Sequence, residues 1–281
     1  MFLHVGPPDA AGYHPLASLV AFADVGDVVT VTPSDRLSLT VTGPFASGLS
    51  GEGDNLILKA LRALGEAAGV EPALAVTLDK RLPIAAGLGG GSSDAGAALR
   101  LADRLLGLNM GEAGLGEVSR IVGADGPMCL MARSVWAEGI GDRLTPAPQM
   151  PPLHAVLANS GRPSPTGAVY RGYDAGPLAA ADRPAPPSDW SPDTVIDWLA
   201  GCRNDLQVPA VTLEPVIGGA LQAMVATGAQ MTRMSGSGAT VFGLFKTRDA
   251  AEQAAEALRC EHPGWWITPV LLGENAAQRR Q

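Results

Sequence analysis

The chain has 281 residues, enough for one large domain or two closely associated ones. Only 17% of its residues are charged, its net charge is −8, and lysine and arginine form no cluster, which excludes a nucleic-acid-binding surface. The three cysteines and four histidines lack the spacing of metal ligands, so we expect a reducing, cytoplasmic setting and no structural metal. No apolar run approaches the roughly 20 residues of a membrane span, and we expect no membrane partner and no signal peptide.

The first quarter of the chain combines strand and helix patterns. Two segments, Val28–Thr32 and Leu37–Thr42, alternate apolar and polar residues, and the turn residues Pro33-Ser34-Asp35 between them predict a β-hairpin. A helix capped by Asp54 is predicted next. Its apolar face has the helical spacing of 3.6 residues and consists of Ile57, Leu61, Leu64 and Ala68. The run Leu74–Leu78 then predicts a strand.

A glycine-rich stretch follows this strand and carries the strongest functional signal. Gly87, Gly89, Gly90 and Gly91 fall within five positions, so the backbone can adopt positive φ and approach a ligand closely. The next three residues, Ser92, Ser93 and Asp94, offer N-cap chemistry, and a helix is predicted over 92–106. A strand, a glycine-rich loop and a helix N-terminus direct free N–H groups and a positive dipole end at one place, which predicts a phosphate site.

Two common phosphate loops do not fit this stretch. A P-loop requires a Gly-Lys pair, which occurs nowhere in the chain, and a dinucleotide-binding fingerprint requires a glycine where Ser92 stands. The structural alternative is a tight turn before a buried helix. A bare turn does not require four glycines followed by two serines and an aspartate, so we favour a phosphate-binding loop of another kind.

The remaining two thirds of the chain continue the mixture of strands and helices. Helices are expected at 112–122, 193–200, 212–227 and 248–259. Strands are expected at 134–137, 153–158, 230–234, 240–245 and 265–272, with 230–234 and 240–245 forming a pair. The proline-rich zone from Pro146 to Pro192 predicts a long connector rather than a packed element. Strands and helices in this order are typical of an α+β sandwich.

Several motifs together resemble the GHMP kinases, the family of galactokinase, homoserine kinase and mevalonate kinase. The segment Pro83-Ile-Ala-Ala-Gly-Leu-Gly-Gly-Gly-Ser-Ser-Asp-Ala is similar to the ATP-binding motif of that family. Its triple glycine followed by Ser-Ser-Asp is the form of one branch, which phosphorylates a cytidyl diphosphate derivative of methylerythritol in the non-mevalonate route to isoprenoid precursors. Other matching segments follow the family order over nearly the whole chain and begin at Phe2, Gly12, Asp54, Gly123, Glu138, Asn204 and Ser235.

The resemblance implies an α+β fold with two domains and a site in the cleft between them. Residues 1–150 would form an N-terminal domain like domain 2 of ribosomal protein S5, with the ATP-binding glycine-rich loop, and residues 151–281 a ferredoxin-like C-terminal domain. The implied activity is ATP-dependent phosphorylation of the 2-hydroxyl of a small-molecule cytidyl diphosphate substrate. The implied cofactors are ATP and Mg²⁺, and the expected assembly is a monomer or homodimer.

The resemblance also implies the nucleotide site. Its ATP-binding positions are Pro83, Ile84, Ala85, Ala86, Gly87, Leu88, Gly89, Gly90, Gly91, Ser92 and Ser93, with Asn55 and Lys80 nearby. Ser92 or Ser93 would contact phosphate or Mg²⁺, and no residue is assigned as a dedicated metal ligand. Local sequence leaves alternatives open, since Asn55 could be only a helix cap and Lys80 only a solvated strand end.

A single aspartate matches the catalytic residue of the family. Asp125, in Gly123-Ala-Asp-Gly-Pro, corresponds to the carboxylate that accepts the proton of the substrate hydroxyl. The local alternative is a turn carboxylate that bonds to its own backbone two residues on, because Asp-Gly-Pro is typical turn chemistry.

The substrate positions implied by the resemblance come from three places in the chain. They are Tyr13, His14, Thr166, Tyr170, Gly236, Ser237 and Gly238. Tyr13 and Tyr170 would sandwich the cytosine, and His14 would bind the base edge. Packing as half-buried surface aromatics is the alternative for the two tyrosines.

One position departs from the family pattern. Relatives have Lys-Ile-Asn or Lys-Leu-Asn immediately before the strand that starts here at Phe2, and that lysine and asparagine contact the reacting centre. In this sequence both would lie upstream of Met1. Two alternatives therefore stand beside the main hypothesis: another GHMP kinase for a different small molecule, and a catalytically impaired nucleotide-binding homologue. The sequence Gly12-Tyr13-His14 favours the cytidyl substrate.

Overall fold

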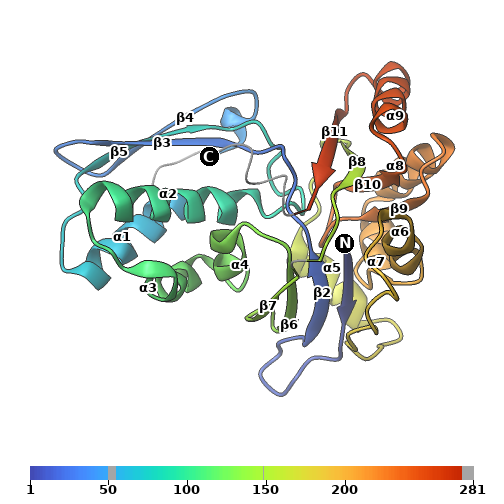
Figure 1. Cartoon of the computed structure of the whole chain (residues 1–281), viewed down its shortest axis with the longest axis horizontal. Coiled ribbons are helices and arrows are strands. Elements are labelled where there is room, and N and C mark those ends of the chain that lie inside the picture. The colour runs from blue at the N-terminus through green and yellow to red at the C-terminus, as the bar shows by residue number, and fades with distance from the viewer. Residues whose placement is uncertain (50–54, 148, 274–281) are drawn as a thin grey trace. The chain divides into compact units, whose positions relative to one another are not determined.

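The computed structural model describes residues 1–49, 55–147 and 149–273, which pack into two compact units (Figure 1). Unit 1 consists of Met1–Val25, Ala85–Leu88 and Arg133–Gln281, and unit 2 of Gly26–Ile84 and Gly89–Ala132. Packing thus groups the start of the chain with its C-terminal half, which differs from a single boundary at residue 150. The assignment of 1–150 and 151–281 to two family domains stays a prediction.

The described residues of unit 2 form a three-stranded sheet and four helices. The strands are β3 (Val28–Pro33), β4 (Ser38–Thr42) and β5 (Leu74–Asp79). The helices are α1 (Leu56–Ala68), α2 (Gly90–Leu106), α3 (Gly111–Ser119) and α4 (Gly126–Met131), with 3-10 turns η1 (Ala46–Gly48) and η3 (Arg120–Val122). Helix α2 packs against α1 and β3. Their buried aliphatic side chains, with those of β5, form one core that includes Leu61, Leu64, Leu74 and Leu99.

The predicted hairpin in this unit is wrong. Strands β3 and β4 do not pair with each other, because β5 lies between them, antiparallel to β3 and parallel to β4. The backbone N–H of Ser34, in the predicted turn, donates instead to Ala73 O, just before β5, at 2.9 Å. Alternation of apolar and polar residues shows that a segment is a strand, but not which strand is its neighbour.

The two long helices of unit 2 start differently from the prediction. The N-cap of α1 is Asn55, whose side chain accepts a hydrogen bond from Ile57 N at 2.9 Å, and the predicted cap, Asp54, lies outside the described residues. Helix α2 begins at Gly90, with Gly89 as its N-cap in a left-handed conformation (φ 64°). The N-cap role predicted for Ser92, Ser93 and Asp94 is therefore wrong, since the glycine starts the helix and the three polar residues lie inside it.

The first sheet of unit 1 joins segments far apart in the sequence. Its strands, in the order β1-β2-β6-β7, are β1 (Phe2–Val5), β2 (Leu16–Val20), β6 (Val135–Gly139) and β7 (Arg143–Pro146), and all neighbours are antiparallel. Phe2, Leu19 and Trp136 are buried in one cluster with Leu153. This cluster is the physical reason why packing does not divide the chain at residue 150.

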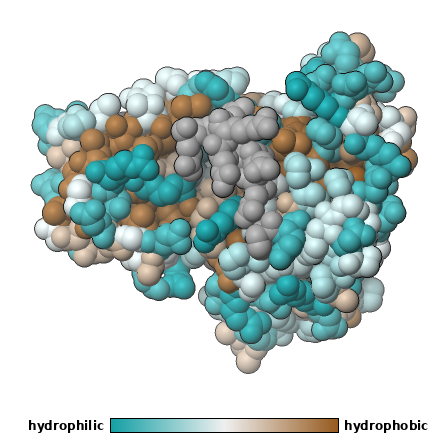
Figure 2. Space-filling view, viewed as in Figure 1, coloured by the Kyte–Doolittle hydropathy of each residue, from teal (hydrophilic) through white to brown (hydrophobic). Residues whose placement is uncertain are grey.

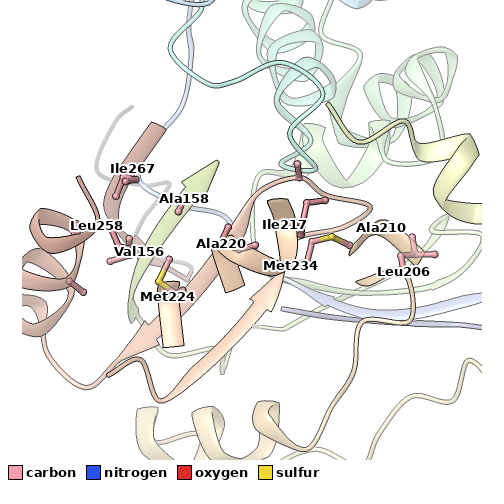
Figure 3. Packing of buried hydrophobic residues seen from close by; sticks show 14 of the residues in the cluster. Val156, Ala158, Leu206, Ala210, Ile217, Ala220, Met224, Met234, Leu258 and Ile267 are labelled. Atoms are coloured by element: carbon pink, nitrogen blue, oxygen red, sulfur yellow. The ribbon is translucent and has the colours of Figure 1, made fainter. Parts of the chain in front are cut away.

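The second sheet of unit 1 confirms the ferredoxin-like part of the predicted α+β fold. Its order is β11-β8-β10-β9, all antiparallel, and the strands are β8 (Leu153–Asn159), β9 (Met231–Met234), β10 (Val241–Phe245) and β11 (Trp266–Leu272). Helices α8 (Pro215–Ala226) and α9 (Arg248–Glu261) pack on these strands. Figure 3 shows the core side chains converging from sheet and helices, among them Val156, Ile217, Met224 and Leu258. Hydrophilic residues cover the outward face of α9 at the upper right of Figure 2.

The proline-rich zone between Pro146 and Pro192 is not only a connector. It contains β8, which the sequence also predicts, and α5 (Thr166–Asp174), which it does not. Val169 and Tyr173 of α5 are buried in the core of unit 1. The helix is nine residues long and its N-cap, Pro165, makes no side-chain cap bond within the described structure, so the usual helix-start signals are missing.

Two further helices, α6 (Pro192–Ala200) and α7 (Gln207–Leu213), complete unit 1, and α7 is not predicted from the sequence. Within the described ranges, no single helix is long and apolar enough to cross a membrane. Helices α7 and α8 together meet the length and composition test, but the chain bends by 119° between them.

Candidate active site

The glycine-rich loop leads from β5 into the N-terminus of α2. Gly87 (φ 70°) and Gly89 (φ 64°) adopt the left-handed backbone that glycine permits without a steric penalty. The hydrogen-bond ladder of α2 begins with Ser93 N donating to Gly89 O at 2.9 Å, so the N–H groups of the three residues before Ser93 are not part of it. Free N–H groups at the positive end of a 17-residue helix can hold phosphate oxygens.

The tip of the loop is bound to the loop between β9 and β10, inside unit 1. Ser235 Oγ donates to Gly87 O at 2.8 Å, and Thr240 N donates to Ala86 O at 3.1 Å. A Cβ on Gly87 would collide with Ser235 O and would come within 2.7 Å of Gly238 O. Gly87 is therefore required both for its positive φ and for close backbone approach.

Asp125 lies beside the N-terminus of α2, in unit 2. Ser92 Oγ donates to Asp125 Oδ1 at 3.0 Å, and Asp125 is half-buried. Asp125 is the N-cap residue of α4, yet within the described residues its side chain makes no cap hydrogen bond. The local alternative, a carboxylate bonded to its own turn, therefore does not describe this residue, and its carboxylate faces the predicted phosphate loop.

Cys129, on α4, lies under the same loop. Its Sγ contacts Gly89 O at 3.7 Å, and burial, with Asp125 as the next cause, raises the pKa of the thiol to about 12. The side chain is 3% exposed. A neutral, buried thiol of this kind packs against the loop and is no nucleophile at physiological pH.

Lys80 forms the centre of a buried charge cluster. Its Nζ lies 2.6 Å from Asp27 Oδ2 and 2.9 Å from Asp94 Oδ2. The side chains of Lys80, Asp27 and Asp94 are at most 7% exposed, so the alternative of a solvated strand end is wrong. Burial lowers the pKa of Lys80, but the two carboxylates outweigh it and the net direction is upward. Lys80 is therefore an ammonium group.

The cluster predicts an unusual pH dependence of stability. Burial, opposed by Lys80 and assisted by Asp27, raises the pKa of Asp94 from 3.8 to about 7. Between these values the folded chain keeps a proton that the unfolded chain has released, so this group makes the free energy of unfolding fall as pH rises, with no further change above about pH 7. Urea unfolding at pH 5 and pH 8 should therefore show that Asp94→Asn gains stability relative to the unsubstituted chain at the higher pH.

The control for this prediction is Asp103→Asn. Asp103 is also on α2 but accepts a hydrogen bond from Met110 N at 3.0 Å, away from the cluster. Its variant should keep the pH dependence of the unsubstituted chain. A stability difference between Asp94→Asn and the unsubstituted chain that is the same at both pH values would show that Asp94 is ionised throughout this range.

Asn55 lies at the start of α1, close to the glycine-rich loop. The neighbouring Leu56 contacts the first turn of α2, since a Cβ on Gly91 would come within 3.3 Å of Leu56 Cδ1. Asn55 also caps α1, as its structural alternative requires. A cap uses only the side-chain oxygen, so the amide group remains a donor for a nucleotide.

The substrate residues predicted from the sequence lie in unit 1, and several are in contact. The rings of His14 and Tyr170 are 4.9 Å apart at 39°, and Tyr173 meets His14 edge-on at 5.7 Å. Tyr13 is 59% exposed. Burial raises the pKa of Tyr170, which keeps its phenol neutral. Among the predicted positions, His14 and Tyr170 thus form an aromatic pair, and Tyr13 is an exposed ring.

His14 is fixed in orientation by its two ring nitrogens. Nδ1 lies 2.9 Å from Gly6 O, and because a carbonyl only accepts, Nδ1 must carry the hydrogen. Nε2 lies 3.3 Å from Asp174 Oδ1, and that carboxylate is 41% exposed. Both ring nitrogens therefore already face oxygen atoms of the protein.

The loop Gly236-Ser237-Gly238 is braced by Asn204 and Ser164, which were not among the predicted site residues. Buried Asn204 donates through Nδ2 to Gly236 O at 2.8 Å and to Met234 O at 2.9 Å. Ser164 Oγ donates to Ser237 O at 2.6 Å. The hydroxyl of Ser237 then pairs with Thr166 Oγ1 at 2.8 Å, which joins two predicted substrate positions. The sequence signal for Asn204 is the family motif Asn204-Asp-Leu.

Known proteins resemble this chain in sequence and fold. Residues 55–133 match the family described as GHMP kinases N terminal domain, and residues 194–264 match GHMP kinases C terminal. A crystal structure of 4-(cytidine 5'-diphospho)-2C-methyl-D-erythritol kinase superposes with a TM-score of 0.77 at 34% identity, covering 97% of this chain and 95% of that one. Mevalonate kinase of L. major shares the fold, with a TM-score of 0.64 at 14% identity over 94% of this chain and 91% of that one.

Curated relatives are closer in sequence. The 4-diphosphocytidyl-2-C-methyl-D-erythritol kinase of Caulobacter vibrioides is 49% identical over 277 residues, 97% of this chain and 96% of the relative. The kinase of the same name from Methylobacterium radiotolerans is 50% identical over 274 residues, 96% and 94% of the two chains.

Fold, glycine-rich loop and family matches define an ATP-using small-molecule kinase of the GHMP class. Within that class, the chain belongs to the 4-diphosphocytidyl-2-C-methyl-D-erythritol kinase family.

Proposed function

We propose that this chain transfers the terminal phosphoryl group of ATP to the 2-hydroxyl of 4-diphosphocytidyl-2-C-methyl-D-erythritol, in the non-mevalonate route to isoprenoid precursors. The single observation that carries the chemistry is the Ser92–Asp125 hydrogen bond, 3.0 Å long, at the N-terminus of α2. It joins a carboxylate to the place where the helix offers free N–H groups. The family relatives support the choice of substrate.

The residues of unit 2 supply the nucleotide side of the reaction. The N–H groups of Gly90, Gly91 and Ser92 bind phosphate oxygens, and the helix dipole favours their negative charge. Lys80, which follows β5, contributes a cation. Asn55, at the start of α1, contributes an amide donor. Asp125 accepts the proton of the attacking hydroxyl as the bond to phosphorus forms.

Mg²⁺ is the metal that this chemistry requires, because it neutralises phosphate charge when bound. The donors present suit it, since Ser92 and Ser93 offer hydroxyl oxygens, which are hard oxygen ligands. Ser92 Oγ and Asp125 Oδ1 are already adjacent. We propose that the two serine hydroxyls hold the ion together with the phosphates of ATP, and that Asp125 beside them accepts the proton.

The residues of unit 1 recognise the cytidyl group. Tyr13 and Tyr170 offer aromatic faces for the cytosine, and His14, held by Gly6 O, offers a ring edge for hydrogen bonding. Thr166 and the loop Gly236–Gly238 bind the polar remainder of the substrate. Stacking of one base on an aromatic side chain contributes about 1–3 kcal/mol.

The substrate assignment is tested by Tyr13→Ala and Tyr170→Ala. Each should raise KM for the cytidyl substrate about tenfold or more, because a stacking face is lost, and leave KM for ATP nearly unchanged. Steady-state kinetics with each substrate varied in turn measure both constants. Tyr170→Phe keeps the ring and should remain close to the unsubstituted enzyme.

Val208→Ala is the matched control, since Val208 is a 75% exposed apolar residue of unit 1. It should change neither KM. If Tyr13→Ala and Tyr170→Ala affect ATP and the cytidyl substrate equally, both tyrosines are packing residues and the proposed substrate loses its support.

A further inference from the structure

Asp27, just before β3, makes more polar contacts than any role assigned so far explains. Its carboxylate is completely buried (0% exposed). Oδ2 contacts Lys80 Nζ at 2.6 Å, while Oδ1 accepts hydrogen bonds from the backbone N–H groups of Arg81 at 2.6 Å and Leu82 at 2.8 Å. The Asp27 side chain therefore fixes Lys80 and also the backbone of the next two residues, which lead into the glycine-rich loop.

This carboxylate also lies against the start of α2. A Cβ on Gly90 would come within 3.3 Å of Lys80 Nζ and 3.6 Å of Asp27 Oδ2. Asp94, one turn further along α2, holds the same ammonium from the helix side. The end of β5 and the start of α2 are thus tied together through Lys80, at the two ends of the loop that carries the phosphate-binding N–H groups.

The two carboxylates of the cluster are not equivalent. Asp27 accepts two backbone N–H bonds in addition to its contact with the ammonium. Asp94 accepts from the Lys80 ammonium at 2.9 Å. Asp27 therefore connects the Lys80 ammonium to the backbone that follows it. A buried ion cluster adds little net stability, so placement of groups is the better explanation for its presence.

We propose that Asp27 is a positioning residue for nucleotide binding, which sets the Lys80 ammonium and the 80–82 backbone in the place where ATP phosphates meet the N-terminus of α2. This inference rests on the proposed function, because it assumes that the glycine-rich loop binds ATP. Asp27 itself does not touch the substrates; it acts through Lys80 and through the backbone that leads into the loop.

Two substitutions separate these contacts. Asp27→Asn keeps an oxygen for the N–H groups of Arg81 and Leu82 but turns an amide toward Lys80, so only the ammonium is released. Asp27→Ala releases all three donors. We expect Asp27→Ala to raise the dissociation constant and KM of ATP about tenfold or more and Asp27→Asn to raise them by less, with KM for the cytidyl substrate unchanged in both.

Asp79→Asn is the control. Asp79 immediately precedes Lys80 in the sequence but pairs with Arg81, in an exposed contact of 2.6 Å. It should leave the constants of both substrates unchanged. ATP titration calorimetry, steady-state kinetics and thermal unfolding are measured on all four proteins. If Asp27→Ala does not fold, Asp27→Asn carries the test.

The outcomes are distinct. A rise in the ATP constants alone supports the proposal, whereas a lower melting temperature with unchanged ATP constants, or an equal rise for both substrates, overturns it and leaves Asp27 a structural residue. Failure of the unsubstituted protein to bind ATP or to phosphorylate the cytidyl substrate would instead overturn the proposed function. The control proteins make these two failures distinguishable.

Discussion

Asp125→Asn is expected to lower kcat by about 10²–10⁴-fold while the dissociation constants of ATP and the cytidyl substrate stay nearly unchanged. The asparagine has the same size, and its oxygen can still accept the hydrogen bond that Ser92 Oγ now donates at 3.0 Å. What is lost is the group that takes the proton from the attacking hydroxyl. Phosphoryl transfer is followed at saturating concentrations of both substrates, and affinities are measured by calorimetry.

Asp103→Asn is the isosteric control, since Asp103 is a structural carboxylate of α2 bonded to Met110 N. Its kcat should equal that of the unsubstituted enzyme. Full activity of Asp125→Asn would show that the carboxylate is not the base, and the proton would then have to leave by another route. A loss of ATP affinity equal to the loss of kcat would show that Asp125 acts in binding.

Gly90→Val should weaken ATP binding by at least about tenfold without unfolding the protein. Gly90 has ordinary helical backbone, so the loss of affinity does not come from an unfavourable φ. Positive φ values occur at Gly87 and Gly89 instead. Its side chain would press on Lys80 Nζ, 3.3 Å from the Cβ position, and would crowd the N–H groups where phosphates bind. The neighbour is the end of a flexible side chain, so the fold can adapt.

Gly116→Val provides the control for helix propensity. Gly116 is on α3 in the same unit, and a Cβ there meets nothing within 4 Å. Both variants replace a helical glycine by a β-branched residue, so they should have similar melting temperatures, and only Gly90→Val should lose ATP affinity in calorimetric titration. Unchanged ATP affinity in a folded Gly90→Val protein would remove the phosphate loop from the mechanism.

Features written in consecutive residues were predictable from the sequence. The β5–loop–α2 unit and the β9–β10 pair each depend on local patterns of glycine, apolar alternation and turn residues. The family motifs singled out both His14 and Tyr170, whose rings are in contact although 156 positions separate them and Tyr170 lies within the proline-rich zone. The roles of Asp125, Lys80 and the substrate residues remain predictions until the variants are measured.

Features created by distant contacts were not predictable. Insertion of β5 between β3 and β4 leaves no mark on the two flanking strands, so a hairpin was the natural local expectation. Asp27 meets Lys80 across 53 positions, and Asn204 meets Gly236 across 32. Neither residue belongs to a periodic pattern. The α5 helix was hidden for a different reason, since its helix-start signals are weak.

Unit 1 is assembled from separated segments of the chain, which affects the order in which the two units fold during synthesis. Leu16 of β2 pairs with Gly139 of β6, so the first sheet cannot close until the whole intervening segment has left the ribosome. Unit 2 is nearly contiguous, interrupted only by Ala85–Leu88, and its contacts form over shorter separations. We expect unit 2 to fold first during synthesis, while the β1–β2 pair still lacks its neighbour β6. The part of the enzyme that carries Asp125 would thus mature before the part that selects the cytidyl group.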